Sequence, residues 1–368
     1  MRFNFWFITL QVSFLALGLV ACDGAGSKDD SDSFDRKALL EHYTKNIIIP
    51  AYSALAEKTL ALQSAASAFH GSSTESDLQI LRNAWKDAAL SWQNANQFNF
   101  GPAGEEGLRK GLLEEIGTFP AATSKIETSV STGQWNTSDF NRDARGLLAI
   151  EYLLYGENQT NAQIIAGFSS VPKRGEFLLA LAEDVHKRVS AVNDGWKTYQ
   201  TDFVNNAGTD VGSSTSMLYN EFVRSYEALK NFKVGVPLGK RAGQTKAEPQ
   251  LLEAYYSGYS LELLKAHFVA MENLWYGHAA VSGTGFKAYI ESTVGGKELV
   301  ASTETQLNAV KQALAAVPVT SNMAEQIKNN PAKLEALHTE LQKLTRFFKS
   351  DMSSLLGIAI TFSSGDGD

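Results

Sequence analysis

The chain has 368 residues, of which 44% are hydrophobic and 20% charged, and its formal net charge at pH 7 is -7. This composition is typical of a globular protein that is long enough to bury one large or two medium cores. The negative charge, and the lack of a Lys/Arg stripe with interleaved aromatic residues, exclude nucleic acid as an expected partner.

The first 21 residues have the pattern of a secretory signal peptide, with a positive Arg2 and an apolar stretch from Phe5 to Val20. The ending Leu19-Val20-Ala21-Cys22 resembles a bacterial lipobox, and Cys22 is the only cysteine of the chain. We therefore expect lipidation of Cys22. The protein would be anchored in the bacterial cell envelope, at the outer membrane, facing the periplasm or the exterior. The alternative is an ordinary signal peptide or membrane anchor with an incidental cysteine.

Residues 22–33 are small, polar and acidic, which predicts a flexible tether between the lipid and a folded domain. From residue 34 onward apolar residues recur at helical spacing. No later apolar run approaches the ~20 residues of a membrane span. The helices are expected in chain order at 34–69 with a kink or break at Pro50, 75–98, 105–116, 120–132, 139–155, 174–204, 217–232, 249–277, 297–316 and 331–356.

The stretch 205–216 is rich in Gly, Ser and Asn and is the best internal boundary. It divides the pattern into a helical subdomain 1 at 34–204 and a helical subdomain 2 at 217–368. Each part carries about four long helices. The sequence therefore predicts an all-α fold of two four-helix-bundle-like subdomains.

The segment 146–156 reads GLLAIEYLLYG, and its only charged residue is Glu151. A helix that is apolar on every side is a buried helix. A buried ionised carboxylate costs several kcal/mol unless it is paired, metal-bound or protonated. Glu151 is therefore either a structural carboxylate, with Arg145 or Arg174 as its partner, or a residue of a ligand pocket.

This segment resembles the signature of the imelysin family of bacterial envelope proteins, which is Gly-x-His-x-x-Glu on a helix, followed by aromatic and leucine residues and a glycine. The matching residues are Gly146, Glu151, Tyr152, Leu153, Leu154 and Gly156. Further blocks similar to those of the family are 84–102, 235–240, 253–264 and 360–368. The resemblance implies an all-helical fold with a site at the junction of two bundles. It also implies a family that is classed among metallopeptidases, in a superfamily that includes iron-uptake proteins.

Two departures from the family pattern bear on the chemistry. The family histidine falls at residue 148, where this chain has Leu148, and many members carry Glu where this chain has Asn96. A zinc site needs about three protein ligands, and Leu148 cannot supply one. The resemblance implies a ligand pocket formed by Glu151, Asn96, Arg174 and Leu148. If a divalent metal binds there, Glu151 is its ligand.

We therefore predict a non-catalytic binding or uptake-accessory protein, connected with iron, whose partners are the membrane through its lipid and a metal or small ligand. The alternatives are a metal-dependent peptidase with additional ligands and a structural envelope protein without a ligand. Two Glu-x-x-His pairs, Glu183/His186 and Glu335/His338, match the spacing of di-iron ligands. Both pairs sit beside the apolar stripes of their helices, so we interpret them as incidental.

Overall fold

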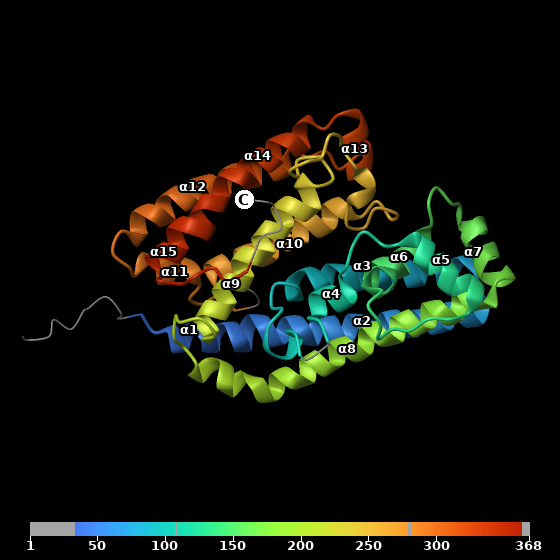
Figure 1. The fold of residues 1–368 in the computed structure, drawn as a ribbon, viewed down its shortest axis with the longest axis horizontal. Coiled ribbons are helices and arrows are strands. Elements are labelled where there is room, and N and C mark those ends of the chain that lie inside the picture. Colours follow the sequence, from blue (N-terminus) through green and yellow to red (C-terminus); the bar gives the residue numbers. More distant parts are fainter. Residues whose placement is uncertain (1–33, 107–108, 279–280, 363–368) are drawn as a thin grey trace, which may run out of the picture. The chain divides into compact units, whose positions relative to one another are not determined.

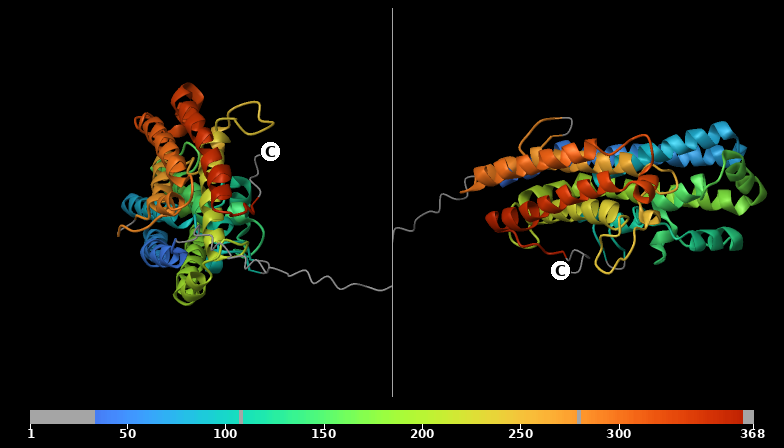
Figure 2. Two further views of the ribbon diagram at one scale, coloured as in Figure 1. Left: turned by 90° about the vertical axis from the view of Figure 1, so that its left-hand side faces the viewer. Right: turned by 90° about the horizontal axis from the view of Figure 1, so that it is seen from above.

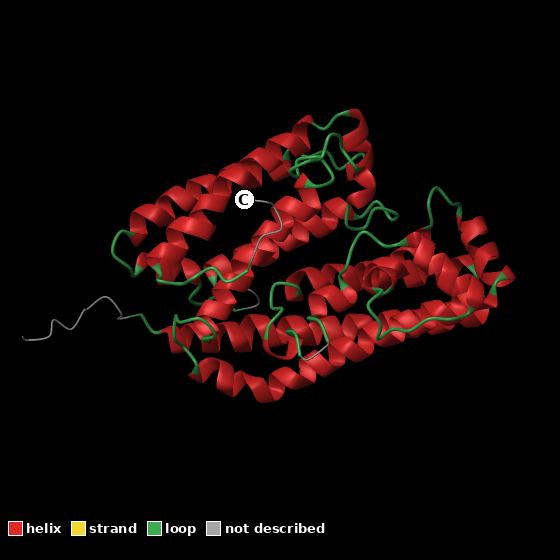
Figure 3. Cartoon of the chain, viewed as in Figure 1, coloured by secondary structure: helices red, strands yellow, loops and turns green. Residues whose placement is uncertain are grey.

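Helices make up all of the regular structure in the part of the chain that the computed structural model describes, residues 34–106, 109–278 and 281–362 (Figure 3). The predicted all-α fold is confirmed. The predicted signal peptide, the tether with Cys22 and the acidic end at 363–368 lie outside these ranges. Within them, no helix combines the length and the apolar character needed to cross a membrane.

Three long helices form the frame of the first half of the chain (Figure 1). α1 (Arg36–Tyr43) continues through a π-helical turn (Thr44–Ile48) into α2 (Ile49–Ser72), and α2 packs against both α3 (Glu75–Ala95) and α8 (Pro172–Asn205). Pro50 has no N–H to donate, and its ring would clash with the carbonyl four residues earlier in a regular helix. The π-helical turn widens the helix just before Pro50, so the predicted break is an irregularity within a continuous helical segment.

Shorter helices cover this frame. They are α4 (Leu112–Ile116), α5 (Thr123–Thr132), α6 (Gly146–Tyr155) and α7 (Asn161–Ser170). α6 packs against α3 and α8, which explains why its sequence is apolar on every side. Periodicity did not predict α7, although a capping box between Thr160 and Gln163 marks its start.

The second half of the chain begins with α9 (Ser214–Glu227), which runs into a π-helical stretch (Ala228–Gly235). The helix predicted at 249–277 is wrong for its first part, because residues 252–259 form turns and α10 (Ser260–Tyr276) starts after them. α12 (Gly296–Ala315) and α14 (Ala332–Arg346) run side by side (Figure 2). The remaining elements are α11 (Phe286–Glu291), α13 (Met323–Asn329), a π-helical turn (Phe347–Met352) and α15 (Ser353–Leu355).

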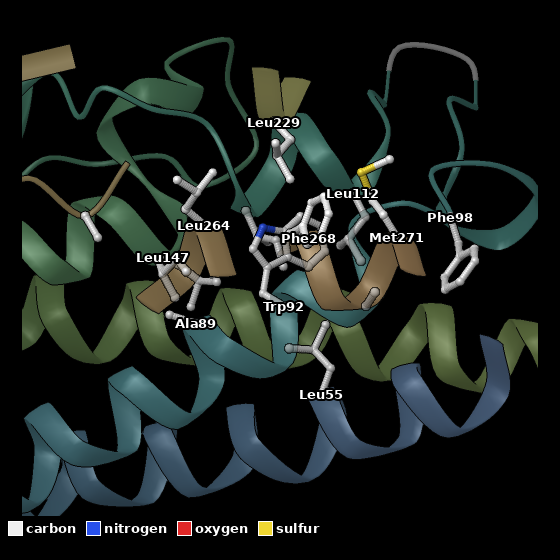
Figure 4. Close-up of a cluster of buried hydrophobic side chains, with 14 of the residues drawn as sticks. Leu55, Ala89, Trp92, Phe98, Leu112, Leu147, Leu229, Leu264, Phe268 and Met271 are labelled. Carbon is white, nitrogen blue, oxygen red and sulfur yellow. The ribbon is translucent and has the colours of Figure 1, made fainter. Parts of the chain in front are cut away.

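The apolar core continues from the first half of the chain into the second. α10 packs on α3, and Trp92 of α3 lies beside Phe268 of α10, within a buried cluster that also contains Leu55 and Leu229 (Figure 4). Each fully buried Leu or Phe stabilises the fold by roughly 1.5–3 kcal/mol. The described residues between 34 and 362 accordingly belong to one compact unit. The boundary at 205–216 between two subdomains stays a prediction.

Candidate functional site

Helix α6 places the only charged side chain of its motif in the core. Its first residue, Gly146, has a φ of +77°, and a Cβ there would lie 2.5 Å from the carbonyl oxygen of Ile116, so only glycine fits. Trp85 Nε1 donates a hydrogen bond of 2.8 Å to the carbonyl oxygen of Leu147 and fixes this end of the helix against α3. Leu148 is buried among apolar side chains, with 3% of its surface exposed.

Glu151 is 1% exposed, and its Oε1 accepts a 2.7 Å hydrogen bond from the backbone N–H of Ser257. Burial raises the pKa of Glu151 to about 7, against the lowering effect of Ser257, and the charge of Glu253 raises it further. Neither predicted arginine pairs with it. Arg145 pairs with Glu115, and Arg174 Nη2 lies 2.6 Å from Glu127 Oε2. Glu151 is therefore a buried carboxyl group that titrates near neutral pH.

A buried polar cluster includes Glu253, which belongs to the same turn segment as Ser257. Lys233 Nζ lies 2.6 Å from Glu253 Oε2 and 2.5 Å from Gln93 Oε1. Gln93 Nε2 donates to Glu253 Oε1 at 3.1 Å, and Asn96 Nδ2 donates to Gln93 Oε1 at 3.1 Å. Burial lowers the pKa of Lys233, while the neighbouring Glu253 raises it. The cluster joins α3, the π-helical stretch after α9 and the turns before α10 in one hydrogen-bonded network.

This network borders a cavity of about 380 Å³, which we call the seam cavity. Its walls come from α3, the segment around α4, the α9–π stretch, α10 and Phe362. The apolar part of the lining consists of Trp92, Leu113, Phe119, Ala228, Phe232 and Phe362, with the Gly117 backbone. The polar part consists of Asn96, Glu114, Thr118, Arg224, Ser225, Glu227, Asn231, Lys233, Glu253 and His267.

Several polar atoms of this lining have no hydrogen-bond partner among the described residues. They are Asn96 Oδ1, Glu114 Oε2, Glu227 Oε2 and His267 Nδ1. Asn96 and His267 are 5% and 2% exposed, so little solvent reaches their side chains. Burial raises the pKa of Glu114 and lowers that of His267 well below its usual value. His267 is therefore neutral, with its Nε2 2.7 Å from Ser225 Oγ.

The other charged groups of the lining are paired. Arg224 Nη2 lies 2.5 Å from Glu221 Oε2, and Glu227 Oε1 lies 3.1 Å from Lys349 Nζ. The groups in the cavity that remain available to a ligand are therefore mainly hydrogen-bond acceptors, because carboxylate and amide oxygens only accept.

The four pocket residues expected from the sequence are not brought together. Asn96 lines the seam cavity, whereas Glu151 and its partner Ser257 do not, and Leu148 is in the apolar core. Arg174 pairs with Glu127 on α5 and does not line the cavity.

Sequence reasoning did not find Lys233, Glu253, Glu114 or His267 as site residues. Lys233 and Glu253 come from separate segments, and no short-range spacing connects them to each other or to Gln93. A signal was present for His267, which is the one histidine within the apolar run of α10. The apolar residues around His267 indicated that it is buried, but not that it lines a cavity.

The residues around the seam cavity and Glu151 do not form a site in which side chains could hold a metal ion. Over the ranges that the structure describes, no group of three or more His, Cys, Asp or Glu residues is placed to coordinate a metal. This holds for the pairs Glu183/His186 and Glu335/His338 as well. His186 Nδ1 instead lies 3.2 Å from Thr59 Oγ1, and His338 borders a separate small cavity.

Comparisons with known proteins agree with the fold. The family model of imelysin, peptidase family M75, matches residues 48–347. Iron-regulated protein A of Synechococcus elongatus is 22% identical over 289 residues, which cover 74% of each chain. A crystal structure described as an iron-regulated protein A precursor from Parabacteroides distasonis superposes with a TM-score of 0.72 at 16% identity, over 90% of this chain and 97% of that one. An imelysin-like protein from Psychrobacter arcticum gives 0.69 at 18% identity, over 89% and 97%.

Proposed function

The chain belongs to the imelysin family, and we propose that it is a non-catalytic binding or uptake-accessory protein whose ligand occupies the seam cavity. The observation that carries this proposal is the set of buried acceptor atoms that lack partners there. A buried polar atom without a partner costs about 1–3 kcal/mol. A ligand that donates hydrogen bonds to Asn96 Oδ1 and Glu114 Oε2 would recover part of this cost.

The shape and lining of the cavity favour a small organic ligand. Its volume of about 380 Å³ lies within the range of roughly 300–1,000 Å³ that is usual for ligand pockets. Aromatic side chains such as Trp92, Phe119 and Phe232 provide apolar walls, and the lining also contains polar atoms without partners among the described residues. We infer a ligand with an apolar body and a positively charged donor group, such as an ammonium. Such a group would favour the ionised form of Glu114.

A connection with iron is supported by the name of a relative, iron-regulated protein A. Peptidase activity of the metal-dependent type has no support from the residues present. Leu148 has no atom that can bind a metal, and Glu151 is engaged with the Ser257 N–H. We therefore place the protein on the binding side of its family, in a process connected with iron supply.

We also propose that the protein is attached to the cell envelope by a lipid on Cys22, with the membrane as a partner. The support is the lipobox-like ending Leu19-Val20-Ala21-Cys22 followed by the acidic stretch up to residue 33. This stretch is long enough to keep a folded domain at a distance from the membrane.

The binding proposal is tested by titrating the protein that begins at residue 33 with phenethylammonium, and with neutral 2-phenylethanol as the matched probe, by calorimetry. We expect the ammonium to bind more tightly. We expect Asn96→Leu to weaken it by about tenfold, the equivalent of one hydrogen bond to a charged group, and Asn96→Asp to tighten it. The proposal is wrong if neither probe binds at millimolar concentration, or if both bind equally and without regard to residue 96.

Metal content measured by elemental mass spectrometry on the same preparations, after loading with iron and zinc, separates this function from the alternatives. We expect less than one metal per chain. One metal per chain, lost together with cleavage of a test protein in Glu151→Ala, would instead support the peptidase.

A further inference from the structure

A second cavity, of about 310 Å³, lies in the first half of the chain between α5, the loop 133–145 and α8, and we call it the α5 cleft. It shares no lining residue with the seam cavity. Besides Lys125 and Asp139, its rim carries neutral hydrogen-bonding side chains, each able to donate and accept. They are Ser124, Thr128, Ser129, Gln134, Asn136 and Asn141.

The floor of the α5 cleft contains a buried arginine with a free donor. Arg145 is 3% exposed, and its two terminal nitrogens bond to the carbonyl oxygen of Thr137 and to Glu115 Oε2. Arg145 Nε has no partner among the residues that the structure describes. An unpaired guanidinium N–H on a residue that lines a cavity favours an acceptor atom there, and a charged acceptor binds it most strongly.

The charges behind this floor are unequal. Glu115 is the common partner of Arg145, Arg142 and Arg188. Arg188 also pairs with Asp184, so three guanidinium groups face two carboxylates in this partly buried cluster. At the rim, Asp139 accepts from Asn141, and Lys125 pairs with Asp143, with water able to screen them. Within this arginine cluster, the excess of one positive charge favours an anionic group next to Arg145.

One wall of the α5 cleft is aromatic. Trp135 packs on the buried Phe177 with ring centroids 5.1 Å apart, and Trp135 itself is only partly buried. The other described tryptophans, Trp85, Trp92, Trp196 and Trp275, are at most 2% exposed. A sugar ring has an apolar C–H face that can lie on an indole, and hydroxyl groups that both donate and accept at its edge.

We propose that the α5 cleft binds a sugar acid, with its ring against Trp135, its hydroxyls on the amide and hydroxyl rim and its carboxylate on Arg145 Nε. Each part of this ligand meets a different feature of the cleft. The carboxylate supplies the missing counter-charge, and ring hydroxyls donate to Asp139. A neutral sugar has no carboxylate for Arg145 Nε. A simple anion has neither a ring for Trp135 nor hydroxyls for the rim.

The test is calorimetric titration of the full chain with D-glucuronate and D-galacturonate, and with D-glucose, D-galactose and acetate as matched controls. We expect the sugar acids to bind at least about tenfold more tightly than the neutral sugars and acetate, because only they make both sets of contacts. Tryptophan emission should change on binding, since Trp135 is the accessible indole of the described part.

Two matched variants locate the site. Thr128→Tyr fills the cleft from α5, and Ser131→Tyr places the same side chain on an exposed position of α5 outside the lining. We expect Thr128→Tyr to lose binding and Ser131→Tyr to bind as the parent does. Both variants should unfold at the temperature of the parent. The proposal is overturned if the sugar acids fail to bind the folded parent, if glucose or acetate binds equally well, or if Thr128→Tyr binds as Ser131→Tyr does.

Discussion

Two carboxyl groups in the first half of the chain are almost equally buried but have opposite kinds of surroundings. The Glu115 side chain is 4% exposed and lies against Arg145, with Arg142 and Arg188 each 3.1 Å away. Glu151 is 1% exposed, and the hydrogen bond it accepts comes from the backbone N–H of Ser257. Glu115 is surrounded by cations, whereas Glu151 has the hydrogen-bond donors of the 256–257 segment and no cation.

The comparison shows two ways of meeting the cost of burying a carboxyl group. Guanidinium groups stabilise the charge of Glu115 and, in return, depend on it. Glu151 has no cation, and burial raises its pKa to about 7, so it meets the cost by taking up a proton. The first arrangement makes the fold depend on ion pairs, and the second makes it depend on pH.

The largest effect is expected from Glu115→Ala. It leaves three arginines facing each other, with Asp184 as the remaining carboxylate, and removing one partner of a buried pair costs about 3–5 kcal/mol. Urea unfolding measures the loss. The control is Glu57→Ala, whose side chain is 74% exposed and pairs with Lys58, and which should cost less than about 1 kcal/mol. Equal losses in the two variants would contradict the reading of Glu115 as the centre of the cluster.

Glu151→Gln should produce the next largest effect, which is a change in how the free energy of unfolding depends on pH. The pKa of Glu151 is higher in the folded protein than its usual 4.5, so the folded state holds the proton more tightly. Its contribution is therefore complete below about pH 4.5 and is lost as pH rises through 7. We expect the free energy of unfolding to fall by about 2 kcal/mol between pH 5 and pH 8 through this group alone.

Glutamine keeps the oxygen that accepts from Ser257 and cannot ionise. The difference in stability between parent and Glu151→Gln should therefore change with pH in the direction that favours the variant at pH 8. Urea unfolding at pH 5, 6, 7 and 8 measures it. If the variant keeps the pH slope of the parent, Glu151 is ionised throughout and has a partner that the geometry does not reveal.

The sequence predicted the long helices well because their apolar stripes run for many turns. α3, α8 and α12 lie within a few residues of their expected ranges. Shorter helices such as α7 and α13 present too few turns for periodicity, although Thr160 and Asn322 cap them. The turns before α10 depend on positive φ at Ala254 and Gly258, and alanine gives no sign of such a conformation.

For the candidate site, the sequence predicted that Glu151 is buried, because its neighbours on the helix are apolar. It could not predict the partner, since Ser257 is 106 residues away and contributes a backbone N–H that any residue type has. Asn96 was reached only through the family resemblance. The pair Lys233–Glu253 depends on tertiary packing of a π-helical stretch against turns, and neither leaves a spacing pattern.

The smallest effect on stability, and the most informative about function, is expected at Asn96. Its Oδ1 has no partner among the described residues, while its Nδ2 donates to Gln93, whose oxygen also accepts from Lys233. Asn96→Leu therefore removes an unsatisfied atom along with one hydrogen bond, and the free energy of unfolding should stay within about 1 kcal/mol of the parent. Gln93→Leu, at the centre of the same network, should cost about 1–3 kcal/mol because Lys233 and Glu253 both lose a partner. Unchanged stability in Asn96→Leu would show that the fold does not need Asn96, which leaves its Oδ1 as an acceptor for a ligand. If Asn96→Leu unfolds as easily as Gln93→Leu, the orphan oxygen is part of the folded network and the seam cavity loses its strongest argument for a ligand.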